Sequence, residues 1–523
     1  MALQAIFNIS WGFALSLFVV YCLVLCSYRL ICHPLRRYPG PLFARISGLY
    51  GAFYASQRRL HIVTRQDHLQ YGRVIRQGPN KLVFNSPQAL RDIYSSDRVE
   101  KSQIYKAGVL GPHFNLFNII DKNAHAKKRK VVGAVLSLQS MRTFEPIMAE
   151  QIGIFIEYLK VCAIASKAVD ISTRTKYLTM DVVGHLAFGY SLNLQTESRN
   201  RNLILGIQRS NHRLNIWMQS SLFVKIRLEI FPYFALLMKK GSHLKIVQTM
   251  IKARLAEEKH ARNDLFSSVT NAANMNPEDS ITLSEIWSEA GLFFPAGGES
   301  ISTATSSLFF YLSRNPDSYH KLRDEVRKTF DNSNEICGGP KLTGCEYLRA
   351  CIDEAMRLAP PAPGTLWRER ASSDDRSRPF TIDGHAIPEG TIFGVNTYAL
   401  HHDEHYFPQP FSFKPERWLS SHTPESEIKV MRTAFAPFSQ GYRGCAGKAM
   451  AYLEASLIIA KTIWHFDFST ATGDLGKIGG GTGLGCELNG REREDEFQLD
   501  DILTAAHRGP YLMFQLREST RKE

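Results

Sequence analysis

The chain has 523 residues, of which 44% are hydrophobic and 22% are charged, a balance that excludes an intrinsically disordered protein and allows a large buried core. Its formal net charge of +13 favours an anionic membrane surface, an acidic partner protein or nucleic acid, without deciding among them. Nine cysteines without a CxxC pair argue against a disulfide framework or a zinc knuckle.

The N-terminal segment, residues 1–30, is predicted to be a membrane anchor. The run Ile9–Tyr28 supplies about 20 largely apolar residues, enough for a helix to cross the hydrocarbon layer. The first charged side chain is Arg29, and positive charge after the span predicts that the following domain is cytoplasmic. A cleaved signal peptide would instead carry positive charge before a shorter apolar stretch. The glycosylation sequon that begins at Asn8 lies so close to the membrane that we expect it to be unused.

Residues 31–45 are predicted to be a proline-rich linker, followed by one domain over residues 46–523. Two prolines in Tyr38-Pro39-Gly40-Pro41 restrict the backbone and make a stiff, extended turn. The next candidate interruption is the glycine-rich stretch 473–490, which we interpret as a surface insertion.

A basic run lies at His125-Ala126-Lys127-Lys128-Arg129-Lys130. Runs of this kind can be nuclear localisation signals or nucleic-acid patches, and the membrane anchor argues against both. The simpler alternative is one solvated, basic face of a helix.

The longest predicted helix begins at Thr282, with Glu285 completing a capping box, and ends at Arg314. A helix of this length spans roughly 48 Å, enough to cross a whole domain. Its centre contains Pro295, which lacks an amide hydrogen, and two glycines that lower helix propensity. We therefore expect a local opening of the helix there, and such departures often mark functional sites.

A second capping box predicts a helix from Thr343 to Leu358, which ends before a pair of prolines. Glu354 and Arg357 lie three residues apart on it. Short strands are predicted at Phe380–Ile382 and Thr391–Val395, so the domain is helix-rich with small sheets.

Two segments suggest binding sites that we consider weak. The cluster His401–His405 contains metal-binding side chains, but the prolines that follow it remove the ordered scaffold that a zinc site needs. The stretch Gly479–Gly483 completes no known phosphate-binding pattern and is predicted to be a flexible loop.

The most informative stretch is Phe435–Gly447, which places Cys445 shortly before an apolar helical pattern over Lys448–Ile463. Free amides and the helix dipole at such a position stabilise a negative sulfur, and we expect them to lower the pKa of Cys445. The glycines allow a flat cofactor to approach the backbone, and Arg443 is suited to bind a carboxylate.

The pattern Phe438-x-x-Gly-x-Arg443-x-Cys445-x-Gly447 is similar to the haem-binding signature of cytochrome P450 monooxygenases. Three further segments match that family in the same order: Ala296-Gly-Gly-Glu-Ser300, Glu354-Ala-Met-Arg357 and Pro415-Glu-Arg-Trp418. The resemblance covers the chain from the anchor to the C-terminus. It implies a mainly α fold with small β-sheets, the cytochrome P450 fold, behind a single transmembrane helix.

The resemblance assigns roles in binding haem b. It implies that the Cys445 thiolate is the axial iron ligand, and that the remaining cofactor-binding residues are Phe438, Arg443, Gly447, His125, Arg129 and Arg368. Arg417 would join Glu354 and Arg357 in a structural triad that holds the Cys445 loop. Lys127, Lys128 and Lys130 would remain on the outer face of their helix, where they could meet an acidic reductase.

The catalytic residues implied by the resemblance are Glu299, Ser300 and Thr303. Family members carry an acid followed by threonine, so Ser300 is a departure, although serine keeps the hydroxyl that donates to bound oxygen. The residues that correspond to the family's substrate pocket are apolar in character and suit a hydrophobic ligand: Phe293, Phe294, Ala296, Thr365 and Leu366.

The function implied is insertion of one oxygen atom from dioxygen into a hydrophobic small molecule, by hydroxylation or epoxidation. Electrons would come from NADPH through a separate FAD/FMN reductase in the same endoplasmic reticulum membrane, because the chain has no flavin or nicotinamide fingerprint. The linker and the basic helix resemble filamentous-fungal enzymes of secondary metabolism, while no residue identifies the substrate. The alternatives are an isomerase, a dehydratase or an oxidative-coupling enzyme with the same fold, and a non-catalytic haem protein.

Overall fold

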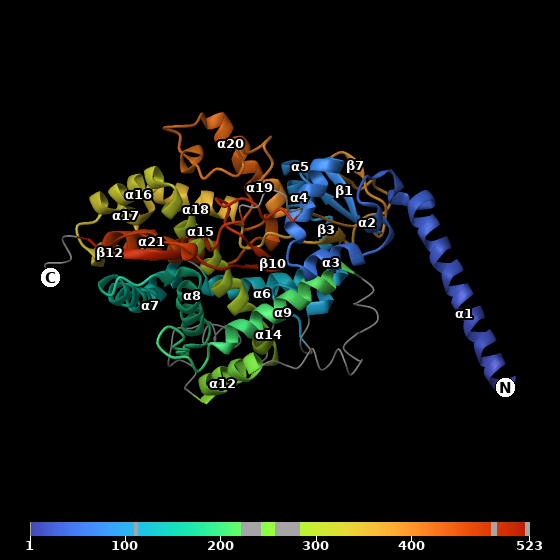
Figure 1. Cartoon of the computed structure of the whole chain (residues 1–523), viewed down its shortest axis with the longest axis horizontal. Helices are drawn as coiled ribbons and strands as arrows, with labels where there is room; N and C mark the ends of the chain where they lie inside the picture. The colour runs from blue at the N-terminus through green and yellow to red at the C-terminus, as the bar shows by residue number, and fades with distance from the viewer. Residues whose placement is uncertain are drawn as a thin grey trace.

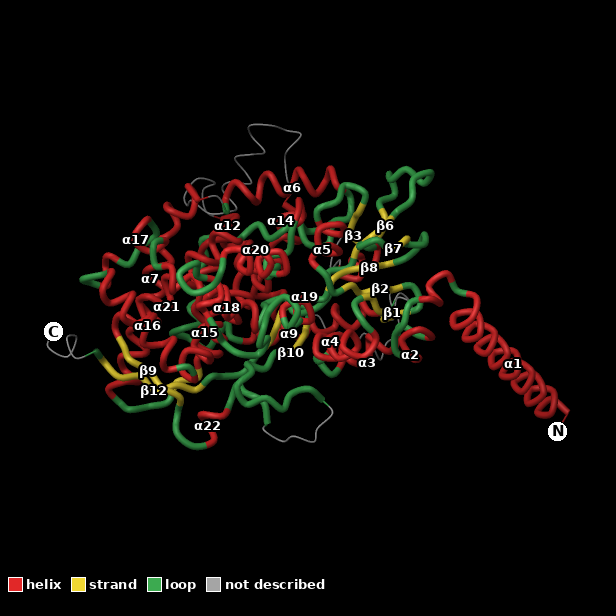
Figure 2. The backbone as a smooth tube through the Cα atoms, turned by 90° about the horizontal axis from the view of Figure 1, so that it is seen from above, coloured by secondary structure: helices red, strands yellow, loops and turns green. Residues whose placement is uncertain are grey.

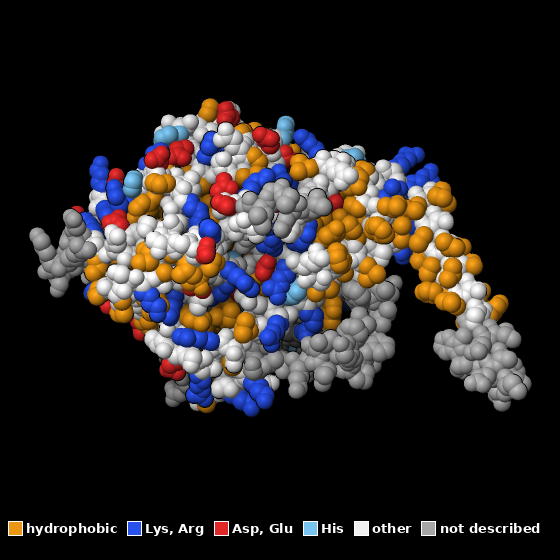
Figure 3. All heavy atoms as spheres, viewed as in Figure 1, with side chains coloured by type: hydrophobic (Ala, Val, Ile, Leu, Met, Phe, Trp, Pro, Cys, Tyr) orange, Lys and Arg blue, Asp and Glu red, His pale blue; other side chains and the backbone are white. Residues whose placement is uncertain are grey.

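The computed structural model describes residues 2–108, 113–136, 138–220, 242–256, 283–482 and 489–517. Its first helix, α1 (Ala2–Ser27), projects from a helix-rich body and continues as a π-helical turn at Tyr28–Cys32 (Figure 1). The window Gly12–Cys32 has a mean hydropathy of 2.1, and none of it is buried. Its exposed side chains form an apolar surface along the helix (Figure 3). By length and composition, this helix is consistent with a membrane anchor.

The linker after α1 is packed on the body rather than suspended from it. The Arg76 amide, in strand β1 (Val74–Gly78), donates to the Pro39 carbonyl at 2.7 Å. The Arg76 guanidinium donates to the Arg29 carbonyl at 2.9 Å. A Cβ atom on Gly40 would approach the Arg76 carbonyl oxygen to 2.4 Å, so this contact requires glycine.

The body is mainly helical, as predicted, and its core surrounds α15, which contacts α8, α18, α21 and α16. Its helices are α2 (Leu42–Ile46), α3 (Leu49–Ser56), α4 (Leu60–Tyr71), α5 (Pro87–Tyr94), α6 (Lys122–Val135), α7 (Leu138–Ile164), α8 (Ile171–Phe188), α9 (Asn202–Gln219), α12 (Ser242–Ala256), α14 (Leu283–Phe293), α15 (Ser300–Arg314), α16 (Pro316–Thr329), α17 (Pro340–Thr343), α18 (Glu346–Leu358), α19 (Thr397–His401), α20 (Glu425–Ala434), α21 (Lys448–His465) and α22 (Asp474–Lys477).

Small sheets lie at the two ends of the body (Figure 2). The five-stranded sheet on the anchor side has the order β1, β2 (Lys81–Phe84), β8 (Ile392–Val395), β5 (Arg368–Arg370) and β3 (Val99–Lys101), with β2 and β8 parallel. The opposite sheet has the order β4 (Val169–Asp170), β12 (Tyr511–Leu516) and β9 (Phe466–Thr470). Two hairpins complete the set: β6 (Thr381–Ile382) with β7 (His385–Ala386), and β10 (Asp500–Ile502) with β11 (Thr504–Ala506).

The long central helix opens where its sequence predicts. A π-helical segment, Phe294–Glu299, separates α14 from α15. The glycines there let α8 approach closely, because a Cβ atom on Gly298 would meet the Met180 sulfur at 2.5 Å. The Thr179 hydroxyl of α8 donates to the Gly298 carbonyl at 2.7 Å, which satisfies a carbonyl beside the irregular turn.

Two local predictions differ from the structure. Thr343 ends the short helix α17 instead of capping α18, because its hydroxyl donates back to the Gly339 carbonyl. In the glycine-rich stretch, Gly481 donates to the Arg493 carbonyl at 2.7 Å, so the described part is a packed turn. The predicted cap at Thr282 and residue 483 of the glycine run lie outside the described residues.

Candidate active site

The loop that carries Cys445 is fixed by its own backbone and by α5. The Cys445 amide donates to the Phe438 carbonyl at 2.8 Å, which closes the loop before α21. Gly441 has φ 69°, and a Cβ atom there would meet the Tyr94 carbonyl oxygen at 2.0 Å. Gly441 therefore serves the close packing of the loop on α5, whereas no atom lies within 4 Å of a Cβ position on Gly447. Phe438 packs against the Tyr452 ring of α21.

The electrostatic surroundings of Cys445 correct our expectation for its pKa. Burial raises the pKa of the Cys445 thiol, while the Gly447 amide and the cations of Arg129 and Lys448 oppose that effect. Desolvation dominates because α21 begins only at Lys448, three residues after the sulfur. The side chain nevertheless keeps an exposed surface. A bound metal ion is what would hold such a sulfur in its ionised form.

Three arginines and one histidine, from three separate elements, lie beside this loop. His125 and Arg129 come from α6, Arg368 comes from β5, and Arg443 comes from the Cys445 loop. Burial and, to a lesser extent, the cations of Arg443, Lys101, Arg129 and Arg368 together lower the pKa of His125 to about 3. The four charges with the largest effect on His125 are all positive. Like charges held this close favour an anion between them, and the two carboxylates of haem b fit that requirement.

The same cations hold the Cys445 loop to its neighbours. The Arg129 guanidinium donates to the Gly444 carbonyl at 2.5 Å, which joins α6 to the loop. Arg443 donates to the Ile119 carbonyl at 2.6 Å and to the Ile120 carbonyl at 2.5 Å, just before α6.

Lys101 is a member of the cation group that the sequence did not indicate. It is buried, its ammonium donates to the Phe117 carbonyl, and it lies 4.1 Å from the centre of the Phe117 ring. Burial holds its pKa well below the ordinary range, with Arg368 and Arg443 adding to the effect. Its position depends on the pairing of β3 with β5, which no local pattern predicts.

Glu354 of α18 lies between two arginines in the buried interior. Its carboxylate accepts from Arg357 Nη2 at 2.8 Å and from Arg417 Nε at 3.0 Å. The Trp418 indole donates to the second oxygen at 3.0 Å. These bonds satisfy a carboxylate that is fully buried, and Arg357 and Arg417 keep its pKa below the usual value despite the opposing effect of burial.

His401 connects this charge cluster to the Cys445 loop. Arg357 donates to the His401 carbonyl at 2.9 Å, and the Ala436 amide donates to His401 Nε2 at 2.9 Å. The ring also stacks on Phe435, with centroids 5.4 Å apart. Burial lowers the pKa of His401 to about 3, so the ring is a neutral acceptor at physiological pH. The sequence suggests only a weak metal-binding role for His401. Its actual partners are distant in sequence, so no local pattern indicates them.

The π-helical segment presents Glu299 and Ser300 on different sides. The Ser300 hydroxyl donates to the Ala296 carbonyl, and Ala296 is exposed although it lies in the central helix. Glu299 is buried, and its carboxylate accepts from the Thr504 hydroxyl of β11 at 3.0 Å. Thr303 lies on the same side as Glu299. The Thr303 hydroxyl is 2.9 Å from the Glu299 carbonyl oxygen and 3.2 Å from His507 Nδ1.

The residues assigned to the substrate pocket do not share one environment. Phe293, Thr365 and Leu366 are half-buried and Ala296 is exposed, as lining residues would be. Phe294 is instead buried in the core, with its ring stacked on Phe188 of α8 at 6.4 Å. Phe294 lies two residues before Ala296, and residues two apart on a helix point to nearly opposite faces.

The basic helix α6 also differs from our expectation. Lys127 and Lys130 are exposed, but Lys128 is buried and contacts α14 through Glu289 at 3.0 Å and Glu285 at 3.3 Å. Lys128 therefore joins two helices and cannot meet a partner protein. Lys128 lies on the inner face of the helix. The segment is basic at almost every position, so its sequence does not show which lysine faces inward.

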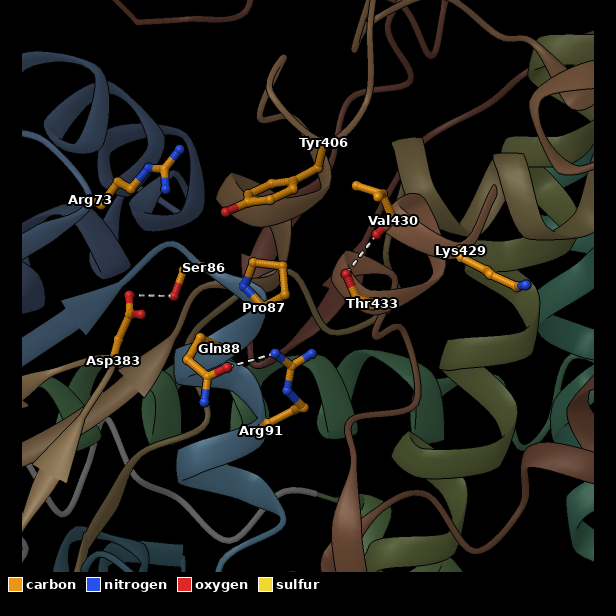
Figure 4. Close-up of a pocket in the computed structure, with 10 residues that line it drawn as sticks. All are labelled: Arg73, Ser86, Pro87, Gln88, Arg91, Asp383, Tyr406, Lys429, Val430 and Thr433. Atoms are coloured by element: carbon orange, nitrogen blue, oxygen red, sulfur yellow. Dashed lines mark hydrogen bonds between the residues drawn. The ribbon is translucent and has the colours of Figure 1, made fainter. Parts of the chain in front are cut away.

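A separate hollow of about 420 Å³ opens at the surface between α5, α20 and the β6–β7 turn (Figure 4). It is lined by Arg73, Ser86, Pro87, Gln88, Arg91, Asp383, Tyr406, Lys429, Val430 and Thr433. No residue that we assign to haem binding or catalysis lines it, so we give it no part in the reaction.

A mainly helical body behind an apolar N-terminal helix, with an accessible cysteine beside a group of buried and half-buried cations, is the arrangement expected of a haem-thiolate protein. A family model described as Cytochrome P450 matches residues 52–483. Cytochrome P450 monooxygenase poxM of Penicillium oxalicum is 34% identical over 509 residues, covering 96% of this chain and 94% of its own. AKT7 of Alternaria alternata is 33% identical, covering 96% of each chain, and apf7 of Gibberella fujikuroi is 30% identical, covering 96% and 97%. The chain belongs to the cytochrome P450 family and has the activity class of a monooxygenase.

Proposed function

We propose that this protein inserts one oxygen atom from dioxygen into a hydrophobic small molecule, with Cys445 as the ligand of the haem iron. The observation that carries the proposal is the group of cations beside the Cys445 loop: Arg129, Arg368, Arg443 and Lys101 all act on His125, and Arg129 donates to the Gly444 carbonyl in the loop. When bound, the haem supplies the activation of dioxygen. The second oxygen atom leaves as water, so each turnover consumes two electrons and two protons.

The chain's own residues would bind the cofactor and move protons. Arg129, Arg368, Arg443 and His125 would hold its carboxylates, with Phe438 and Gly447 beside it. The triad of Glu354, Arg357 and Arg417 would keep the Cys445 loop in place through His401. Glu299 would supply protons to the oxygen site, and the Ser300 hydroxyl would donate there after exchanging its bond to Ala296.

The electrons would come from NADPH through a separate FAD/FMN reductase in the same membrane. Exposed lysines of α6, Lys127 and Lys130, suit an acidic docking partner. The protein would lie in the endoplasmic reticulum membrane, and the arginines that follow α1 favour an orientation with the body in the cytoplasm. The relatives from filamentous fungi support a substrate from secondary metabolism, oxidised by hydroxylation or epoxidation.

Isotope-labelled dioxygen tests the reaction class. The full chain, a fungal reductase and NADPH are incubated with a metabolite extract from a strain that lacks the gene. A metabolite that gains one labelled oxygen atom supports the proposal. A product that forms without labelled oxygen and without NADPH would instead identify an isomerase or a dehydratase.

Substitution of Ser300 tests its part in proton delivery. With the metabolite found in that experiment, Ser300→Ala is expected to lower product formed per NADPH by about tenfold or more, because the donating hydroxyl is lost. Ser300→Thr keeps the hydroxyl and is expected to retain coupling. Equal coupling in Ser300→Ala and the wild type removes Ser300 from the proton route.

A further inference from the structure

The side of the π-helical segment that carries Glu299 faces strand β11 and the residue that follows it. Thr504 of β11 donates to the Glu299 carboxylate at 3.0 Å. The Thr303 hydroxyl lies 3.1 Å from the Ala505 carbonyl oxygen and 3.2 Å from His507 Nδ1. One oxygen of the Glu299 carboxylate is therefore directed toward this hairpin.

A lysine of α8 reaches the same place. The Lys176 ammonium donates to the Ser172 hydroxyl at 2.9 Å and to the His507 carbonyl at 3.0 Å. Ser172 donates to the same carbonyl at 3.1 Å. Glu299 and His507 are buried, whereas Lys176 is only half-buried. Of Glu299, His507 and Lys176, Lys176 is thus the one whose side chain is not fully buried.

The charges of Glu299 and Lys176 act on each other. Burial raises the pKa of Glu299, and the Lys176 ammonium is the strongest opposing influence, ahead of Thr504 and Gln208. Burial lowers the pKa of Lys176, and Glu299 is the strongest opposing influence, followed by Asp170 and Asp500, while Arg508 adds to the lowering. Burial therefore brings the pKa values of Glu299 and Lys176 closer together, which favours proton transfer between the two groups.

We propose that Lys176 relays protons from solvent to Glu299 through the seam between α8 and the β10–β11 hairpin. The ammonium gives one proton to the carboxylate, and a hydronium ion of the solvent then reprotonates the neutral amine and leaves as water, so no electrons move. His507 is a positioning residue, since its carbonyl holds Lys176 and its ring holds Thr303. The inference rests on the proposed role of Glu299.

An infrared pH titration of the full-length holoenzyme tests the coupling directly. The carboxyl band of Glu299 is assigned as the band lost in Glu299→Gln. In Lys176→Met, or in Lys176→Gln if the first variant does not fold, the midpoint of this band is expected to rise by about one pH unit or more. Lys176→Arg keeps the charge and should retain the wild-type midpoint, as should Lys167→Met, which removes an exposed lysine. An unchanged midpoint in the neutral variants overturns the proposal.

A turnover assay distinguishes the proposed relay by Lys176 from the proposed role of Glu299. Oxygen consumption is measured with NADPH and an FAD/FMN reductase, without added substrate, in water and in deuterium oxide. Lys176→Met is expected to lower the rate by about tenfold and to enlarge the solvent isotope effect. If Glu299→Gln lowers the rate and Lys176→Met does not, the relay is wrong and the role of Glu299 stands. If Glu299→Gln itself changes nothing, the proposed role of Glu299 fails.

Discussion

Glu454 is a buried carboxyl group whose effect on the free energy of unfolding can be measured. It lies on α21, and within the described part of the chain neither of its carboxylate oxygens has a hydrogen-bond partner. Burial raises its pKa to about 8. The folded protein therefore holds a proton on Glu454 at pH values where the unfolded chain has lost it, and stability falls as pH rises from the unfolded pKa toward 8.

Replacement of Glu454 is expected to remove that pH dependence. At pH 8 and above, Glu454→Met should be more stable than the wild type, by up to roughly 5 kcal/mol if the whole shift is recovered. Below pH 4.5 the difference between the two proteins should become independent of pH, because Glu454 is then protonated in both the folded and the unfolded state. Denaturant unfolding across this range measures it. Glu427→Gln, which alters an exposed glutamate, should leave the curve unchanged, and a parallel curve for Glu454→Met would contradict the assignment.

Individual site residues differ in how far the sequence reveals them. Cys445 and Arg443 lie in one short motif, so their proximity could be predicted. Lys101 and His401 acquire their contacts through strand pairing and through the packing of α19 beside the Cys445 loop, which no local pattern encodes. Lys128 was misplaced because a run of lysines does not show which one faces inward.

At the scale of secondary-structure elements, α18 depends on the charges that it buries. Glu354 neutralises Arg357 and Arg417 in the interior. In Glu354→Gln both guanidinium groups would lose that neutralisation, which typically costs about 3–5 kcal/mol. We expect a lower unfolding temperature and a lower haem content per protein, because the Cys445 loop is tied to Arg357 through His401.

Glu346→Gln is the matched control for this prediction, because Glu346 is exposed in the first turn of the same helix. It should change stability by less than about 1 kcal/mol. Full haem content in Glu354→Gln, together with an unchanged unfolding temperature, would show that the charge cluster does not support the loop.

The ends and interruptions of helices could be predicted where proline or glycine residues determine them. The proline and glycines at 295–298 predicted the opening of the central helix, and the proline pair after α18 predicted its end. The beginning of α18 was wrong by three residues, because Thr343 is used by the preceding helix α17. Phe294 shows the same limit, since its burial against Phe188 of α8 is a tertiary contact that no local pattern predicts.

At the scale of the whole molecule, the contact of the linker with β1 joins the apolar helix α1 to the body. Gly40→Ala would force a Cβ atom against the Arg76 carbonyl oxygen. We expect this change to destabilise the protein by roughly 1–3 kcal/mol, measured as a lower unfolding temperature.

Gly153→Ala provides the comparison for this prediction. Gly153 lies inside α7, with no atom within 4 Å of its Cβ position, so alanine should be neutral or stabilise by up to about 1 kcal/mol. If Gly40→Ala is as stable as Gly153→Ala, the linker does not pack on β1 as described.

The fold class could be predicted because several motifs of one family occur in the same order along the chain, and the full-length relatives bear this out. The packing of the linker could not, since the prolines define a stiff turn without indicating the strand on which it lies.

The central claim is that Cys445 is the sulfur that binds the haem iron. The most direct measurement is the absorption spectrum of the reduced, carbon monoxide-bound holoenzyme, compared with that of Cys445→Ala and of Cys351→Ala, which removes a buried cysteine elsewhere. The wild type and Cys351→Ala are expected to show the red-shifted Soret band of a thiolate ligand, and Cys445→Ala is expected to lose it. A wild-type spectrum without that band, or a Cys445→Ala protein that keeps it, would contradict the account.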